Sequence, residues 1–341
     1  MSGGAMSGNG SAGGRSGGAV LPNRLTPIGL RRGLQVMAAW GRDGTDPSGF
    51  EQFRLEPFRT WPGAAEAVWY RPEDGRFAEP TEVLVVEGLS LRFGGVQALV
   101  GVDLRARTGE VTGVIGPNGA GKSTLFNCLS GLLTPDAGRV TFHGTSLTGA
   151  PALRARRGLG RTFQTPRLFK SLSVLDNLLF GCETADWSGH RYVFDTRLGR
   201  LPHAERAEEI ARLVGFRGDL ATPAAALPFG DLRTVELARA LCGAPSLLML
   251  DEPASGLDTE QADRFVGLMS SLAAMGLAIL LIEHDMALVM ELCRRITVLD
   301  FGQVIATGTP DEVQRDDAVI RAYLGRGTGG HPRGERSGAR A

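Results

Sequence analysis

The 341-residue chain has little of what marks several classes of protein. Its 37 basic and 37 acidic residues cancel, so no net charge attracts nucleic acid or anionic lipid, and we expect no nucleic-acid partner. The apolar run at 277–282 ends at Glu283, far short of the about 20 residues that a membrane helix needs. We therefore expect no membrane-spanning segment.

Cysteine is also scarce. The four residues are far apart in the sequence, and no CxxC spacing points to zinc or to a redox pair. They are expected to be small buried residues in a reducing compartment: Cys128, Cys182, Cys242 and Cys293. The first 18 residues contain no apolar stretch of the kind found in signal peptides, so we expect no secretory signal.

Composition divides the chain into four parts. Residues 1–19 are rich in Gly and Ser, and the tail 325–341 has a similar composition; both are predicted to be disordered because they cannot bury enough apolar surface. Residues 20–80 hold three of the four tryptophans without a lasting period and form an N-terminal extension of unknown role. Residues 82–324 are the predicted folded domain.

Strands and helices alternate in that domain, which predicts an α/β fold with a mostly parallel sheet. The region from about 158 to 242 lacks a strong strand signal and is predicted to be an inserted helical subdomain. The expected strands are 83–91, 111–115, 247–250, 278–282 and 296–299, and the expected helices include 122–132, 259–275 and 286–293.

A glycine-rich motif carries the strongest chemical signal. It fits G-x-x-x-x-G-K-[ST] and lies between a β-branched strand and a helix, so its backbone N–H groups are expected to surround phosphates. Lys122 would supply a cation to the β- and γ-phosphates of ATP, and the Ser123 hydroxyl would bind Mg²⁺. The motif comprises Gly116, Pro117, Asn118, Gly119, Ala120, Gly121, Lys122, Ser123 and Thr124.

A pair of carboxylates forms the second motif. Asp251 and Glu252 follow the apolar run 247–250, at the carboxyl end of a predicted strand, where parallel sheets bind ligands. Asp251 is suited to holding Mg²⁺, usually through water, and Glu252 to acting as the general base for the attacking water.

The order of these motifs resembles that of the ATPase subunits of ABC transporters over residues 82–324. The resemblance implies a P-loop NTPase (RecA-like) core, an antiparallel β subdomain and an inserted helical subdomain. It rests on Phe93, the P-loop, Gln164, a segment containing Gly230, the pair Asp251-Glu252, residues 255–258 and His284.

The same resemblance implies roles for single residues. Phe93 would stack on adenine, and Gln164 would touch Mg²⁺ or the attacking water and sense the membrane subunit. Asp258 would contact the opposite ATPase subunit, as would the segment around Gly230. His284 would hydrogen-bond the γ-phosphate.

Three further stretches resemble the ATPases of bacterial branched-chain amino acid importers and their urea and amide relatives: 160–169, 282–286 and 319–325. This implies two transmembrane permeases, a second ATPase in a homo- or heterodimer and, indirectly, a periplasmic or extracellular solute-binding protein. It also implies a cytoplasmic subunit, peripheral on the inner face of the cell membrane, that powers import of a small polar solute.

One segment departs from the family pattern. Where the family has Leu-Ser-Gly-Gly-Gln or Leu-Ser-Tyr-Gly, this chain has Leu227-Pro228-Phe229-Gly230-Asp231. Pro228 has neither the serine hydroxyl nor a backbone donor, and Asp231 adds negative charge near a phosphate-facing loop. Because a donor to a charged group contributes about 1.5–3 kcal/mol, we expect the ATP site completed by this segment to be weakened.

Three alternatives stay open at this point. An export or lipid-extraction ATPase would share every motif, although residues 221–226 lack the acidic-Gly element typical of exporters. A non-transport ABC protein would need two cassettes or a long coiled coil, and neither is visible. A nucleotide-binding regulator without turnover is disfavoured by Glu252 and His284 and slightly favoured by Pro228.

Overall fold

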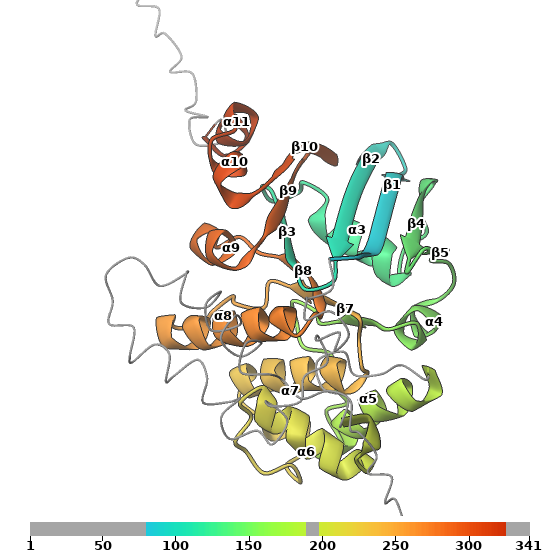
Figure 1. Ribbon diagram of the computed structural model, residues 1–341, viewed down its shortest axis with the longest axis vertical. Helices are drawn as coiled ribbons and strands as arrows, with labels where there is room; N and C mark the ends of the chain where they lie inside the picture. The colour runs from blue at the N-terminus through green and yellow to red at the C-terminus, as the bar shows by residue number, and fades with distance from the viewer. Residues whose placement is uncertain (1–79, 189–197, 325–341) are drawn as a thin grey trace, which may run out of the picture.

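A computed structural model describes residues 80–188 and 198–324 (Figure 1). The Gly/Ser-rich start at 1–19, nearly all of the extension at 20–80 and the tail at 325–341 lie outside the described residues. Within the described part, no helix has the length and apolarity needed to cross a membrane.

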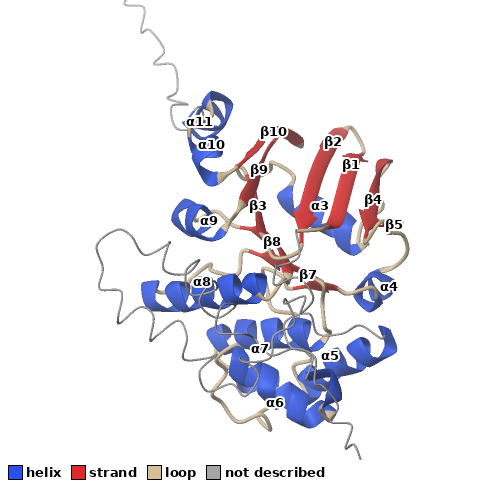
Figure 2. Ribbon diagram, viewed as in Figure 1, coloured by secondary structure: helices blue, strands red, loops and turns tan. Residues whose placement is uncertain are grey.

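The six-stranded sheet holds the centre of the fold, in the order β10-β9-β3-β8-β7-β6. Its five neighbouring pairs are parallel except β10 with β9, which confirms the predicted mostly parallel sheet (Figure 2). Its strands are β3 (Val111–Ile115), β6 (Leu159–Arg161), β7 (Leu247–Asp251), β8 (Ala278–Ile282), β9 (Arg295–Asp300) and β10 (Gln303–Gly308).

A four-stranded antiparallel sheet lies beside it, in the order β2-β1-β4-β5, as the family resemblance implied (Figure 2). Of its four strands, the sequence pattern predicts only β1. In β2 a register shift near Gly101, which has φ 61°, interrupts the two-residue alternation that marks a strand. The strands are β1 (Glu82–Phe93), β2 (Val96–Arg107), β4 (Ala137–Phe142) and β5 (Thr145–Ser146).

Alternate residues of the central strands face two different cores. Leu248 and Leu250 of β7 join one cluster, which includes the helices of the inserted region. Leu247 and Met249 join the other, which includes helix α3 and the antiparallel sheet. The central strands are therefore apolar on both faces, which explains why they read as continuous apolar runs.

The inserted region is mainly helical, and α5, α6 and α7 pack on one another below the six-stranded sheet (Figure 1). It differs from the expectation at its start, where three residues form β6 and extend the sheet beside β7. The helices are α3 (Lys122–Ser130), α4 (Pro151–Arg156), α5 (Val174–Ser188), α6 (His203–Leu213), α7 (Phe229–Cys242), α8 (Thr259–Ala274), α9 (Met286–Leu292), α10 (Pro310–Gln314) and α11 (Asp317–Leu324).

Candidate nucleotide site

The P-loop connects β3 to α3 in the middle of the sheet. Helix α3 has no side chain capping its N-terminus and no acidic residue in its first turn. The Nζ atom of Lys122 donates to the carbonyl oxygens of Gly116 and Pro117, at 2.7 and 3.2 Å. Burial lowers the pKa of Lys122, whereas the nearby Glu252 and Asp251 raise it. Uncapped N–H groups and a lysine at a helix start are a suitable binding site for phosphate.

Two glycines of this loop are required by close packing behind it. A Cβ atom on Gly116 would lie 2.0 Å from the carbonyl oxygen of Leu299, and one on Gly121 would lie 2.6 Å from that of Ala98. Both glycines also have positive φ, 149° and 101°. A Cβ atom on Gly119, by contrast, would meet nothing within 4 Å, so only its positive φ of 82° favours glycine there.

Three residues predicted to act in catalysis meet at one carboxylate oxygen. The Gln164 Nε2 atom donates to Glu252 Oε2 at 2.8 Å, and His284 Nδ1 lies 3.8 Å from the same oxygen. Glu252 has φ 49°, an unusual conformation for a residue with a side chain, and its N–H donates to the Ile282 carbonyl at 2.9 Å. Segments that follow β6, β7 and β8, far apart in the sequence, therefore converge at one end of the sheet.

Asp251 is buried next to this oxygen cluster, and its charge has a partner that the sequence did not suggest. Arg161 Nη2 lies 3.4 Å from Asp251 Oδ2, while Arg161 Nη1 donates to the Phe126 carbonyl and to Ser130 Oγ. Burial raises the pKa of Asp251, and Arg161 opposes that effect. The arginine thus joins the end of α3 to the carboxylate at the end of β7.

The donors near Asp251 fit Mg²⁺ bound together with a nucleotide. Among residues 80–188 and 198–324, no group of three or more His, Cys, Asp or Glu side chains could enclose a metal ion. Mg²⁺ typically takes one or two protein ligands and fills its shell with water and substrate phosphates, so a complete protein cage is not needed. One carboxylate, an exposed hydroxyl at Ser123 and the Gln164 amide meet that requirement.

Known proteins share this sequence and fold. The family described as ABC transporter matches residues 99–255, and a family described as branched-chain amino acid ATP-binding cassette transporter matches residues 303–328. The high-affinity branched-chain amino acid transport ATP-binding protein LivG of Salmonella typhimurium is 41% identical over 249 residues, covering 71% of this chain and 98% of LivG. The chain belongs to the ATP-binding subunits of ABC transporters.

Two other comparisons agree. BraF of Pseudomonas aeruginosa, of the same description as LivG, is 38% identical over 259 residues, covering 71% of this chain and 98% of BraF. The ADP conformation of MJ1267, an ATP-binding cassette of an ABC transporter, is similar with a TM-score of 0.62 at 32% identity, covering 72% of this chain and 99% of MJ1267. The ABC subunit therefore binds nucleotide and hydrolyses ATP to drive transport.

The remaining predicted site residues of the ABC subunit lie apart from the Glu252 cluster. Phe93 ends β1 and is half exposed, at a hairpin whose second strand packs Ala98 against Gly121. Asp258 is exposed and caps α8, accepting from the Gln261 N–H at 2.8 Å. Gly230 is exposed in the first turn of α7. These three residues are placed on the surface, as contacts with a ligand or a second subunit would require.

A buried carboxylate that the sequence analysis missed connects two parts of the site. Glu283 is 1% exposed, and it accepts from the N–H groups of Ala254, at 2.7 Å, and His284, at 3.1 Å. It therefore fixes the turn after Glu252 to the backbone of His284. In the sequence, the role of Glu283 is indicated only by its position directly after an apolar strand.

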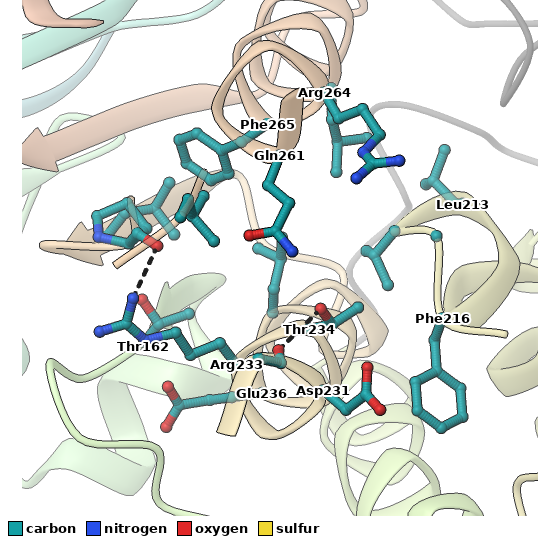
Figure 3. Close-up of a pocket in the computed structure, with 18 of the residues that line it drawn as sticks. Thr162, Leu213, Phe216, Asp231, Arg233, Thr234, Glu236, Gln261, Arg264 and Phe265 are labelled. Carbon is teal, nitrogen blue, oxygen red and sulfur yellow. Dashed lines mark hydrogen bonds between the residues drawn. The ribbon is translucent and has the colours of Figure 1, made fainter. Parts of the chain in front are cut away.

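A cavity of about 910 Å³ lies between α7, α8 and the segment that follows β7 (Figure 3). Gln261 and Arg264 extend from α8 towards α7, and Arg233 donates to the Pro253 carbonyl at 3.5 Å and also to that of Ser255 (Figure 3). Glu252 lines the cavity, but no P-loop residue does. The cavity thus borders both the helical subdomain and the Glu252 side of the nucleotide site.

Proposed function

We propose that this ABC subunit hydrolyses Mg²⁺-bound ATP at a site built from the P-loop and the Glu252 cluster. The observation that carries the proposal is the meeting of Gln164 and His284 at Glu252 Oε2, next to the strand end that bears Asp251. Glu252 accepts the proton of the attacking water, and Gln164 orients that water. His284 donates to the γ-phosphate, and Lys122 stabilises the charge on the β- and γ-phosphates.

Ser123, Asp251 and Gln164 are the residues that would hold Mg²⁺. When bound, the ion offsets phosphate charge as the γ-phosphoryl group leaves. Phe93 stacks on the adenine from its hairpin, where its ring is half exposed. The P-loop backbone from Gly116 to Thr124 surrounds the phosphates.

The full site includes a second ATPase subunit. Gly230 and Asp258 are exposed on the two segments that, by the family resemblance, contact the opposite subunit. In our proposal, two ATPases pair head to tail, so that each P-loop faces the other's Gly230-type segment. In this pairing, the unusual residues Pro228 and Asp231 affect the ATP site that contains the partner's P-loop.

The subunit is proposed to act on the inner face of the cell membrane, bound to two permeases that receive solute from a binding protein outside. The exposed, tilted ring pair Phe169 and Phe180, with centroids 5.1 Å apart, lies after Gln164 and is suited to contact a permease segment. The solute is proposed to be a branched-chain amino acid or a related amide, because LivG and BraF carry that description over nearly their full length.

Uptake in cells tests the solute. Labelled leucine and labelled urea are supplied to the source strain and to a strain whose only copy carries Glu252→Gln. Loss of leucine uptake with normal urea uptake is the expected result, and loss of urea uptake alone would move the solute to the amide class. Unchanged uptake of both compounds would refute the proposed solute class. ATP hydrolysis by the purified complex tests the proposed ATP site independently of the solute.

A further inference from the structure

The turn that carries Gln164 is attached to a carboxylate on a different element. Glu236 lies in the middle of α7 and is only 2% exposed. Its Oε2 accepts from the Phe163 N–H at 3.1 Å, and its Oε1 accepts from the Arg167 N–H at 2.7 Å. One side chain therefore spans the turn, with Gln164 between its two attachment points.

A buried carboxylate at this position has to be compensated. Burial raises the pKa of Glu236, and the two backbone N–H groups together with Arg239 and Arg167 oppose that effect. Arg239, one turn further along α7, places Nη2 4.0 Å from Glu236 Oε1. An apolar residue would pack in α7 at no such cost, so the two hydrogen bonds to the turn are what the carboxylate adds.

Two arginines contact the Phe163 side chain of the same turn. The guanidinium carbons of Arg161 and Arg167 lie 4.7 and 4.5 Å from the centroid of the Phe163 ring. With Glu236 on the backbone and the arginines on the ring, Phe163 is fixed directly before Gln164. The Gln164 amide then reaches Glu252 Oε2 at 2.8 Å.

Helix α7 begins at Phe229 and Gly230, the segment proposed to face the partner's nucleotide, and it also carries Arg233, which donates to the Pro253 carbonyl. Through Glu236, α7 is thus hydrogen-bonded to the backbone on both sides of Gln164. Helix α7 therefore contacts the segment after Glu252 through Arg233 and the Gln164 turn through Glu236, which suits such a connection.

We infer that Glu236 is a positioning residue for ATP hydrolysis, which holds the Gln164 turn on α7 and so sets the position of the Gln164 amide at Glu252. The inference rests on the proposed role of Gln164. Glu236 itself contacts neither nucleotide nor water in this role, and it acts only through the turn.

The test uses Glu236→Gln in the transporter complex purified through the full-length chain. Glutamine keeps the shape but has one acceptor oxygen, so one of the two N–H groups faces an NH₂ donor. We expect turnover to fall about tenfold or more, with the KM for ATP within about twofold, because hydrogen bonds to a charged acceptor are among the stronger ones and the P-loop is untouched. In a Gln164→Ala background the same change should cost less than about twofold.

Asp176→Asn is the matched control. Asp176 accepts from the Ser173 N–H and Oγ at the start of α5, at 3.3 and 2.6 Å, so the same chemical change is made in the same subdomain away from the turn. Its effect on turnover should be small and equal in both backgrounds. If Glu236→Gln does not fold, Glu236→Met removes the buried charge, and it should fold while still losing turnover.

Two results would overturn the inference: an equal loss from Glu236→Gln in both backgrounds, as expected of a residue that supports only the fold, or no loss at all. Unchanged turnover in the Gln164→Ala single variant would show that Gln164 takes no part in hydrolysis. The role inferred for Glu236 would then fail together with the proposed role of Gln164. Loss of turnover in Gln164→Ala with normal turnover in Glu236→Gln would refute the role of Glu236 alone.

Discussion

Arg161 Nη2 lies 3.4 Å from Asp251 Oδ2, and the two side chains are 7% and 9% exposed. The arginine also donates to the Phe126 carbonyl in the middle of α3, so a single buried cation links the P-loop helix to the carboxylate proposed to hold Mg²⁺. Two strands and a helix that supply different parts of the site are fixed to one another at this point.

Arg161→Met should therefore destabilise the fold. Removing one partner of a buried ion pair leaves the other uncompensated, and the free energy of unfolding should drop by about 3 kcal/mol. Urea unfolding with nucleotide absent measures the change. Arg139→Met is the control, because the Arg139–Glu87 pair is 68% and 48% exposed and should contribute less than about 1 kcal/mol. Similar losses in the two variants would contradict a special role for Arg161.

Lys122→Ala should abolish ATP binding. Lys122 is the proposed cation of the phosphate site, and its ammonium group donates hydrogen bonds to the Gly116 and Pro117 carbonyls of the loop. Lys170, the other lysine of the chain, is exposed and lies outside the P-loop, so Lys170→Ala should bind normally. Calorimetric titration with ATP and Mg²⁺ measures both affinities, and retention of tight binding by Lys122→Ala would contradict the assignment.

Glu252→Gln should separate binding from turnover. The glutamine keeps the side-chain size but cannot accept the proton of the attacking water, so ATP affinity should persist while phosphate release falls by a factor of about 100 or more. Glu260→Gln, on an exposed residue paired with Arg264 in α8, should leave both quantities unchanged. Full turnover by Glu252→Gln would exclude Glu252 as the base.

The central strands and the P-loop could be predicted from the sequence because each is specified by its own residues. The apolar residues of Val111–Ile115 specify a strand, and the glycines after them specify a phosphate-binding loop, without help from the rest of the sheet. Strand β6 could not be found that way, because three residues are too few to show a period. It exists only because β7 offers an edge beside it.

For the site residues too, the sequence predicts which residues take part, but their positions depend on the fold. Gln164, Glu252 and His284 were identified by motif, but their convergence on one oxygen depends on the order of β7, β8 and β3 in the sheet. Arg161, Glu236 and Glu283 were missed since each looks like an ordinary charged residue in sequence. Only burial, at 2% for Glu236 and 1% for Glu283, distinguishes the two carboxylates.

The two ATP sites of a heterodimer should be unequal. The site that uses Lys122, Glu252 and His284 has a complete set, whereas the site that uses Pro228 and Asp231 lacks one γ-phosphate donor; in the structure Pro228 precedes α7 and makes no side-chain cap. Glu252→Gln should remove nearly all activity, and the equivalent change in the partner should remove much less. Phosphate release by the two variant complexes measures the asymmetry.

Restoring the segment completes that experiment. Pro228→Ser combined with Asp231→Gln should raise turnover at the weaker site, because a hydroxyl donor returns and a negative charge leaves. Equal losses from the two glutamate variants, with no gain on restoration, would show that the departure at Pro228 is simply tolerated.

The back of the P-loop is closed by the end of β9 and the turn that follows it. The Gly302 N–H donates to the Ala120 carbonyl at 3.0 Å, and the Leu299 carbonyl leaves no room for a side chain on Gly116. Strand β3, which leads into the loop, pairs with β8 and β9, which come more than 150 residues later in the described part of the chain. On the ribosome, the phosphate-binding sequence therefore emerges long before the residues that shape it. A nascent chain halted before Gly302 would carry the complete motif but lack the backbone that closes the rear of the loop.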